Sequence, residues 1–283
     1  MGHYDWISFT TDYGLSDGFV AACHGVVARI APQLRVIDVT HAVAPGDIGR
    51  GAAVLAQIVP HLPPSVHLAV VDPGVGTTRR ALAVETEAGL LVGPDNGLLW
   101  PAAEALGGIL RVVELTETGW FAPVVSATFH GRDVFAPVAA RLALGADLGD
   151  GGPPVDPRTL VRLPEPVVVV GDGWLDAEVR SIDRYGNVQL AAAGAQLAGY
   201  DGPLRVGGLP AVRTSTFGEA APGELVVFVD SAGQVALGIN GGRAVVAMSV
   251  HPGDLVRLSR ADSPATDGPE GSETDSRNHP GAR

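Results

Sequence analysis

The sequence predicts an α/β N-terminal domain with a mainly parallel sheet, followed by a smaller all-β, barrel-like C-terminal domain. Across the first half, apolar runs of strand length alternate with alanine-rich helical stretches, which is the pattern of βα units. After residue 145 the apolar runs become short and are separated by Gly, Asn and Asp, as in small barrels or sandwiches. A chain of 283 residues also suits two cores better than one. We therefore expect domains at 1–150 and 166–260, joined by a linker at 151–165.

The N-terminal half alternates strand and helix patterns. The expected strands cover 6–10, 35–39, 66–71, 81–85, 89–92 and 109–115, and the expected helices cover 19–30, 49–59, 98–106 and a stretch ending near Leu144. Ser16 or Asp17 is expected to cap the first helix, because short polar side chains favour that position. The fourth and fifth strands are close enough in sequence to form a hairpin.

The C-terminal half shows only strand patterns. The expected strands cover 166–170, 174–182, 188–190, 204–206, 224–229, 234–239, 244–250 and 254–258. From residue 261 onward Ser, Pro, Asp, Gly and Glu dominate, so 261–283 is expected to be a disordered tail.

Composition restricts the class of protein and of partner. The chain is 46% hydrophobic and 18% charged, with a net charge of −12, which argues against a nucleic-acid or anionic-membrane partner and favours a small ligand. Cys23 is the only cysteine, so an intrachain disulfide and a thiolate zinc cluster are excluded. The N-terminus lacks the features of a signal peptide and no run of 18 apolar residues occurs, so a soluble, cytoplasmic protein is expected.

Residues 68–80 are the most informative stretch of the chain. Four apolar residues lead into Asp72, and a Pro/Gly cluster then turns the chain, as at the carboxyl end of a buried strand. Open α/β sheets bind their ligands at that edge. Asp72 and Arg79 stand at the two ends of this loop, where they form either a structural ion pair or part of a pocket.

Other strand ends in the N-terminal half also carry polar residues. These residues are Asp12, Asp17, Asp72, Arg79, Asp95, Asn96, His130, Arg132 and Asp133. Two classes of hydrolase fit them. One is a metal hydrolase built from Asp12, Asp72, Asp95, His130 and Asp133, and the other is a metal-free site in which Asp, Arg and His form a hydrogen-bonded set. His130 lies next to Gly131, which would let a ligand approach the backbone. The remaining histidines, His24 and His41 among them, show no metal-ligand spacing.

Six ordered motifs together resemble one family, the S-adenosyl-L-methionine hydroxide adenosyltransferases, hydrolase relatives of the fluorinase and chlorinase once grouped as domain of unknown function 62. The motifs are Thr-Thr-Asp-Tyr-Gly at 10–14, Asp-Pro-Gly-Val-Gly-Thr at 72–77, Pro-Asp-Asn-Gly-Leu at 94–98, Thr-Phe-His-Gly-Arg-Asp at 128–133, Ile-Asp-Arg-Tyr-Gly-Asn at 182–187, and Asp230-Ser231 with Asn240-Gly241. The match runs from residue 6 to about 258. It implies a homotrimer whose active sites lie between the N-domain of one subunit and the C-domain of the next.

The resemblance also implies a reaction, in which S-adenosyl-L-methionine and water give adenosine and L-methionine without a metal or another cofactor. It assigns the ribose hydroxyls to Asp12, the methionine ammonium to Asp183 and the methionine carboxylate to Ser231. The adenine is assigned to Asn187, Asn240, Gly241 and Phe217, and Asp17 and Phe129 are further substrate-binding candidates. Asp72, Arg79 and His130 match the set associated with water. Ala232 departs from the family pattern, where a polar residue follows the serine.

The chemistry explains why such a site needs these residues. The sulfonium leaves as a neutral thioether, so the leaving group requires neither an acid nor a metal. Water is the limiting partner, because its pKa is roughly 15.7 and it is a poor nucleophile. His130 can act as a base, or Arg79 can stabilise a hydroxide-like water, and the sequence does not choose between them. The alternatives to a hydrolase are a halogenase and a non-catalytic adenosine- or S-adenosyl-L-methionine-binding protein. Halide-using relatives carry tyrosine-like residues in place of Asp72 and His130, which favours the hydrolase.

Overall fold

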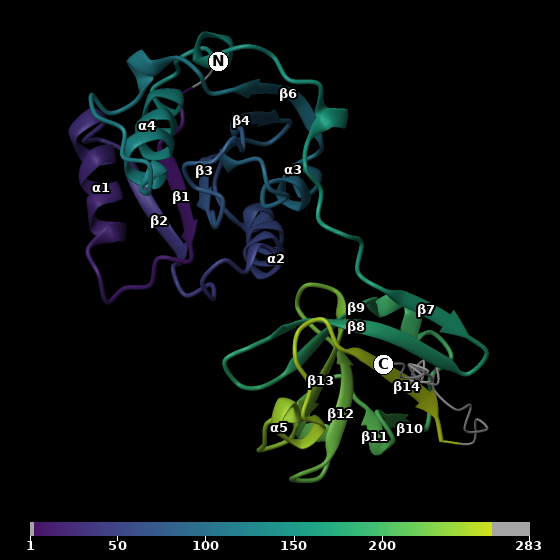
Figure 1. Ribbon diagram of the computed structural model, residues 1–283. Helices are drawn as coiled ribbons and strands as arrows, with labels where there is room; N and C mark the ends of the chain where they lie inside the picture. The colour runs from purple at the N-terminus through teal and green to yellow at the C-terminus, as the bar shows by residue number, and fades with distance from the viewer. Residues whose placement is uncertain (1–2, 262–283) are drawn as a thin grey trace, which may run out of the picture. The chain divides into compact units, whose positions relative to one another are not determined.

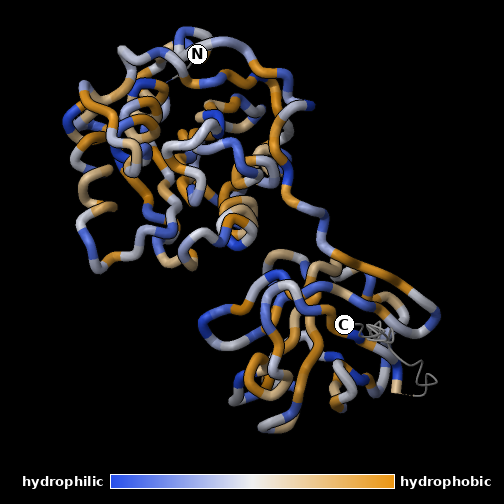
Figure 2. The backbone as a smooth tube through the Cα atoms, in the orientation of Figure 1, coloured by the Kyte–Doolittle hydropathy of each residue, from blue (hydrophilic) through white to orange (hydrophobic). Residues whose placement is uncertain are grey.

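The computed structural model describes residues 3–261 and divides into two compact units between Pro166 and Val167. The expected tail lies, beyond Ala261, outside the described residues. Hydrophobic segments follow the strands and helices of each unit, and hydrophilic segments follow many of the connecting loops (Figure 2). No helix within residues 3–261 is both long enough and apolar enough to span a membrane.

The first unit is built from alternating strands and helices (Figure 1). Its strands are β1 (Trp6–Thr11), β2 (Arg35–Thr40), β3 (Val66–Val70), β4 (Ala81–Thr86), β5 (Leu90–Pro94) and β6 (Ile109–Glu114). Its helices are α1 (Phe19–Ile30), α2 (Ile48–Ile58), α3 (Trp100–Ala105) and α4 (Ala136–Ala143), with a π-helical turn, η3 (Gly131–Phe135), directly before α4. The elements follow the sequence-based expectation closely. The predicted cap of α1 is wrong, since Gly18 occupies the N-cap and no side chain caps the helix.

The six strands form one sheet in the order β2-β1-β3-β5-β4-β6. Strands β2, β1, β3 and β5 are parallel, while β4 is antiparallel to both of its neighbours. Only β4 therefore runs against the rest of this sheet, and the prediction of a mainly parallel sheet is confirmed. Because β4 is reversed, its first residues lie at the edge where β3 and β5 end. This topology brings Arg79 and Arg80, which precede β4, to the loops that follow β3 and β5.

Helices cover both faces of the sheet. One core contains buried side chains of α1 and α4 against Ile7, Phe9 and Leu68. The other contains side chains of α2 and α3 against Ala69, Val71 and Leu91. Figure 1 shows the same arrangement, with α1 and α4 on one side of the strands and α2 and α3 on the other. A buried sheet of this kind holds the loops at its carboxyl edge on a rigid base.

Residues in the expected linker contact the first unit. Arg80 Nη2 donates a hydrogen bond to the Thr159 carbonyl at 2.7 Å, and the Val161 N–H donates to Asp95 Oδ1 at 3.0 Å. The segment up to Val161 is thus attached to the carboxyl edge of the sheet by charged side chains.

The second unit is a closed barrel, as predicted. Its strands are β7 (Val168–Gly171), β8 (Trp174–Ile182), β9 (Val188–Ala193), β10 (Pro203–Val206), β11 (Leu209–Arg213), β12 (Leu225–Val229), β13 (Gln234–Ile239) and β14 (Leu255–Arg260). The order is β14-β10-β11-β12-β13-β9-β8-β7, and pairing of β14 with β8 closes the barrel. Alternate side chains point inward, so that residues such as Leu175, Ala177 and Val179 of β8 are fully buried.

Two expectations for this unit are wrong. Residues 244–250, expected as a strand, contain the helix α5 (Ala244–Met248), which ends at Ser249 with a left-handed φ of 52°. A short apolar run does not distinguish strand from helix by periodicity alone. Strand β11 was not predicted, and it contains Pro210, a residue that weakens a strand pattern; Pro210 pairs with Arg205 of β10.

Candidate functional site

The loop between β3 and β4 holds a buried ion pair of Asp72 and Arg79. Arg79 Nε donates to both carboxylate oxygens at 3.0 Å, and Nη2 donates to Oδ2 at 2.5 Å. The Asp72 side chain is only 4% exposed and the Arg79 side chain only 11%. A bidentate contact of this kind fixes the plane of the guanidinium as well as its position.

His130 completes a set of three side chains. It immediately precedes η3, and its Nδ1 lies 2.9 Å from Arg79 Nη2. A guanidinium has no acceptor, so Arg79 donates and Nδ1 carries no proton. His130 in this arrangement is neutral, with its proton on Nε2. Burial and the Arg79 charge lower the pKa of His130, while Asp72 and Asp133 oppose that shift, so the neutral form is the stable one at neutral pH.

Tyr13, in the loop after β1, lies against Gly131, the residue after His130, and was given no role by the sequence. A Cβ atom at position 131 would overlap with the Tyr13 hydroxyl, so Gly131 makes room for the tyrosine. The expectation that Gly131 opens the backbone to a ligand is therefore corrected. Burial raises the pKa of Tyr13 well above its usual value, with smaller contributions from Cys23 and Asp12, so the phenol stays protonated. The sequence signal that could have identified Tyr13 is its position in the motif at 10–14.

Phe129 belongs to an aromatic cluster with Tyr13 and Phe19. The rings of Phe129 and Tyr13 are 5.7 Å apart, and those of Phe129 and Phe19 are 5.3 Å apart, both in edge-to-face geometry. Arg132 lies over the Phe129 ring at 4.8 Å. The cluster thus supplies an apolar wall beside the polar triad.

The loops that carry the triad touch through their backbones at Gly76. Its φ is +76°, and a Cβ atom there would overlap with the Ala127 carbonyl oxygen. Only glycine satisfies both conditions without strain. Gly76 therefore sets the spacing between the loop of Arg79 and the loop of His130.

Asp12 directly follows β1 at the same edge of the sheet. Its Oδ2 accepts a hydrogen bond from the Gly46 N–H at 2.8 Å, which holds the carboxylate across the start of α2. Asp17 lies exposed in the loop before α1. A hydrogen bond thus fixes the Asp12 carboxylate, whereas Asp17 lies at the surface.

The acids proposed for a metal hydrolase are separately paired. Arg80 binds Asp95 through a 2.6 Å ion pair, and Arg132 binds Asp133 at the same distance. Burial would raise the pKa of Asp133, but hydrogen bonds from Arg132 and the Ser126 N–H outweigh it and hold that pKa below its usual value. Because Asp72, Asp95 and Asp133 each neutralise an arginine, they favour the metal-free alternative.

In the second unit, Asp183 and Asn187 close the turn between β8 and β9. Asp183 accepts hydrogen bonds from the Asn187 N–H at 2.9 Å and from Asn187 Nδ2 at 2.7 Å. A Cβ atom at Gly238 would lie 2.5 Å from Phe217 and 3.0 Å from Asn187 Oδ1. Gly238 was not singled out by the sequence, yet it lets Phe217 and Asn187 gather at one end of β13.

Ser231 lies at the other end of β13. It is exposed in the β12–β13 turn, next to Asp230, which accepts a hydrogen bond from Gln189 Nε2. Asn240 and Gly241 follow β13, and Asn240 Nδ2 donates to the Ala220 carbonyl at 2.8 Å. The structure therefore separates Ser231 from the other predicted residues of this unit by the length of a strand.

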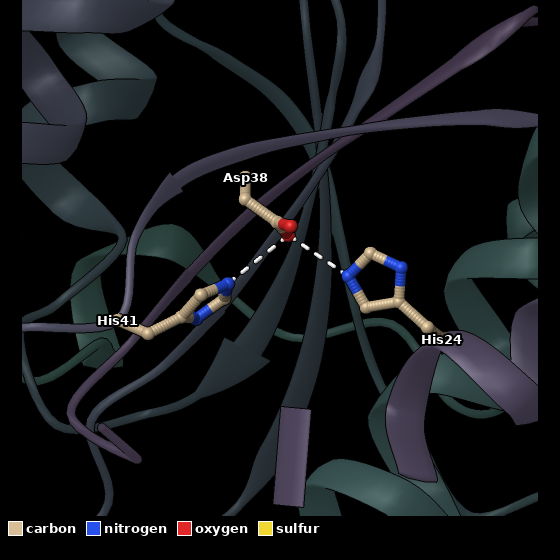
Figure 3. A group of neighbouring side chains, drawn as sticks. All are labelled: His24, Asp38 and His41. Carbon is tan, nitrogen blue, oxygen red and sulfur yellow. Dashed lines mark hydrogen bonds and ion pairs between the residues drawn. The ribbon is translucent and has the colours of Figure 1, made fainter. Parts of the chain in front are cut away.

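A cluster of two histidines and an aspartate lies in the first unit. His24 of α1, Asp38 of β2 and His41 gather with their ligand atoms within 4.8 Å of one another (Figure 3). These histidines show no metal-ligand spacing in the sequence, yet the structure brings two of them together. Sequence spacing could not reveal it, because the three residues come from three different elements.

The chain matches known proteins along nearly its whole length. Models of the SAM hydroxide adenosyltransferase N-terminal and C-terminal domains match residues 7–152 and 177–257. A Salinispora tropica protein named (R)-S-adenosyl-L-methionine hydrolase is 65% identical over 92% of this chain and 99% of its own. A Thermus thermophilus protein of that name is 41% identical over 89% and 98%. An Actinoplanes protein named fluorinase is 27% identical over 90% and 97%.

A solved structure of an uncharacterised conserved protein from Thermotoga maritima has a similar fold. It has a TM-score of 0.84 and 35% identity, covering 90% of this chain and all of that one (100%). The two domain models cover most of the chain in the expected order. The chain therefore belongs to the SAM hydroxide adenosyltransferase family.

Proposed function

We propose that the protein hydrolyses S-adenosyl-L-methionine to adenosine and L-methionine, with Asp72, Arg79 and His130 activating the attacking water. The observation that carries this proposal is the hydrogen bond from Arg79 Nη2 to His130 Nδ1. It leaves two donors for a ligand, the His130 Nε2–H and Arg79 Nη1, which makes no hydrogen bond to another described residue. N–H donors of this kind favour the anionic form of a bound solvent molecule, hydroxide.

This arrangement supports electrostatic activation by Arg79 over base catalysis by His130. The lone pair that a base needs is at Nδ1, and Arg79 already occupies it. Hydroxide then attacks C5′ of the ribose, the C–O bond forms as the C–S bond breaks, and the electron pair leaves on the methionine sulfur. The proton lost by water passes to solvent. Asp72 keeps Arg79 in place and offsets its charge.

The remaining substrate assignments follow the family motifs. Asp12 binds the ribose hydroxyls, while Asp183 binds the methionine ammonium and Ser231 its carboxylate. Asn187, Asn240, Gly241 and Phe217 bind the adenine, and Asp17 and Phe129 line the substrate.

The substrate form is the (R) epimer at sulfur, which the names of the hydrolase relatives specify. Purified protein is incubated with each epimer, and adenosine and methionine are measured by chromatography. We expect faster adenosine formation from the (R) form, undiminished by a chelator. Loss of activity on chelation would instead favour the metal-hydrolase class, and tight adenosine binding without turnover would favour a binding protein.

A halogenase is the second candidate, because one relative is named a fluorinase. Incubation with chloride or fluoride tests it directly. A 5′-halo-5′-deoxyadenosine as the main product would overturn the hydrolase proposal.

The active unit is proposed to be a homotrimer whose sites combine the N-domain of one subunit with the C-domain of the next. Exposed apolar side chains near the site loops support a subunit contact, with Leu15 at 78% and Val124 at 80% exposure. Inactive Arg79→Ala and Asp183→Ala proteins are mixed, dissociated and reassembled. Recovery of activity is expected, because some sites then combine two intact domains, whereas no recovery would place each site within one chain.

A further inference from the structure

Three side chains from α1, β2 and the following loop converge in the first unit (Figure 3). His24 Nε2 lies 2.9 Å from Asp38 Oδ1, and His41 Nε2 lies 3.0 Å from the same oxygen. Two imidazoles thus face one carboxylate oxygen from different sides. Two imidazole nitrogens and a carboxylate are a donor set that suits first-row transition metals.

His41 provides a second, independent observation. Its side chain is only 3% exposed, and its Nδ1 is hydrogen-bonded to Thr11 Oγ1 at 2.8 Å. Its Nε2 is buried and has no aligned hydrogen-bond partner among the described residues, although it faces Asp38. A buried ring nitrogen without a partner costs free energy. A cation between them could bind both the His41 imidazole and the Asp38 carboxylate.

We propose that His24 Nε2, the Asp38 carboxylate and His41 Nε2 bind one divalent transition-metal ion, for which Zn²⁺ is the probe. The Asp38 and His24 side chains are 44% and 34% exposed, so solvent can reach a fourth ligand position.

The surroundings orient the proposed ligands. The Phe9 ring packs 5.9 Å from the His24 ring and 4.9 Å from the His41 ring, which gives both an apolar support. When Nε2 binds the ion, Nδ1–H donates to Thr11 Oγ1, a contact that fixes the imidazole as metal-site partners commonly do. The His41 carbonyl also accepts from the Gly14 N–H at 2.7 Å. The ion would thus tie α1 and β2 to the loop that carries Asp12, as a structural site.

The test measures Zn²⁺ binding to chelator-treated full-length protein without substrate, by calorimetry and by the Zn²⁺-dependent rise in Tm. We expect one ion per chain, and at least 10-fold weaker binding with loss of the Tm rise in both His24→Ala and Asp38→Asn. Both positions are partly exposed, and circular dichroism checks that the variants fold. Thr11→Val should weaken binding roughly 10- to 100-fold by releasing the His41 ring.

The matched control is His251→Ala, which removes an exposed histidine that lies 3.6 Å from Asp254 and has no third ligand nearby in the described chain. It should bind Zn²⁺ like the unchanged protein. Unaltered binding in His24→Ala and Asp38→Asn, or no binding by the unchanged protein, would overturn the proposal. Neither result bears on hydrolysis, because no substrate is present.

Discussion

Arg79 and Arg80 are neighbours in the chain, and each binds a buried aspartate at the same edge of the sheet. Arg79 holds Asp72, and Arg80 holds Asp95, whose side chains are equally buried at 4% exposure. The difference lies in the second contact. Arg79 donates to the imidazole of His130, whereas Arg80 donates to the hydroxyl and the main-chain carbonyl of Thr159.

In the proposed mechanism, this second contact separates the reactive ion pair of Arg79 from the structural ion pair of Arg80. Arg80 makes its hydrogen bonds to other parts of the fold, namely Asp95 and Thr159. Its partner Asp95 also accepts a hydrogen bond from the Val161 N–H through Oδ1. The contact of Arg79 with His130 instead leaves a donor, Nε2–H, for a ligand. Four predictions test this distinction.

Arg79→Ala should lower kcat roughly 10³-fold, because it removes the main charge that stabilises hydroxide. Arg80→Ala should leave kcat nearly unchanged but lower the free energy of unfolding by roughly 2 kcal/mol, since Asp95 loses a charged hydrogen bond. Adenosine formation and urea unfolding are measured for both variants. Equal losses of kcat in the two variants would contradict the comparison.

His130→Asn should lower kcat roughly 10²-fold. The asparagine carbonyl can still accept from Arg79 but offers no donor at the position of Nε2. KM for S-adenosyl-L-methionine should stay within a few-fold, because His130 is not assigned to substrate binding. A large rise in KM with unchanged kcat would mean that His130 binds substrate and does not activate water.

Gly76→Ala should slow hydrolysis by roughly 10- to 100-fold, because a misplacement of about 1 Å can have that effect. The added Cβ would push the Arg79 loop away from Ala127 and thus from His130. Gly223→Ala is the matched control, since Gly223 also has a positive φ of 84° but open space around its Cβ. Similar kinetics in the two variants would show that loop spacing does not matter.

The smallest expected effect is the fall of kcat/KM on the acid side of the pH profile. Burial and Arg79 lower the pKa of His130 below its usual value, so kcat/KM should fall only below about pH 6.5, as Nδ1 takes a proton and repels Arg79. The same shift costs stability as the pH falls from about 6.5 toward the lowered pKa, because the unfolded chain binds that proton more readily. His130→Asn should flatten this limb, and an unchanged limb in that variant would assign it to another group.

Features set by residues close together in the sequence could be predicted, whereas contacts between residues far apart in the sequence could not. The βα alternation predicted the first unit, because period and turn residues are local. The Asp72–Arg79 pair was accessible for the same reason, as both ends lie on one loop. The contact with His130 depends on the reversal of β4 and on the fit of Gly76 against Ala127, which no local pattern encodes.

Other features were hidden for related reasons. Gly131 was interpreted as an opening for ligand, whereas the space belongs to Tyr13 from a loop more than a hundred residues away. Residues 244–250 were assigned to a strand because five apolar residues carry no clear period. His24, Asp38 and His41 became a cluster only once α1 had packed against β2.

The most direct test of the central claim is a double-mutant cycle of kcat for adenosine formation, with Arg79→Ala, His130→Asn and the double variant. If the two side chains activate one water as a unit, the double variant should be about as slow as Arg79→Ala alone. If the two losses multiply, Arg79 and His130 act independently, and the account of a joint hydroxide site is contradicted.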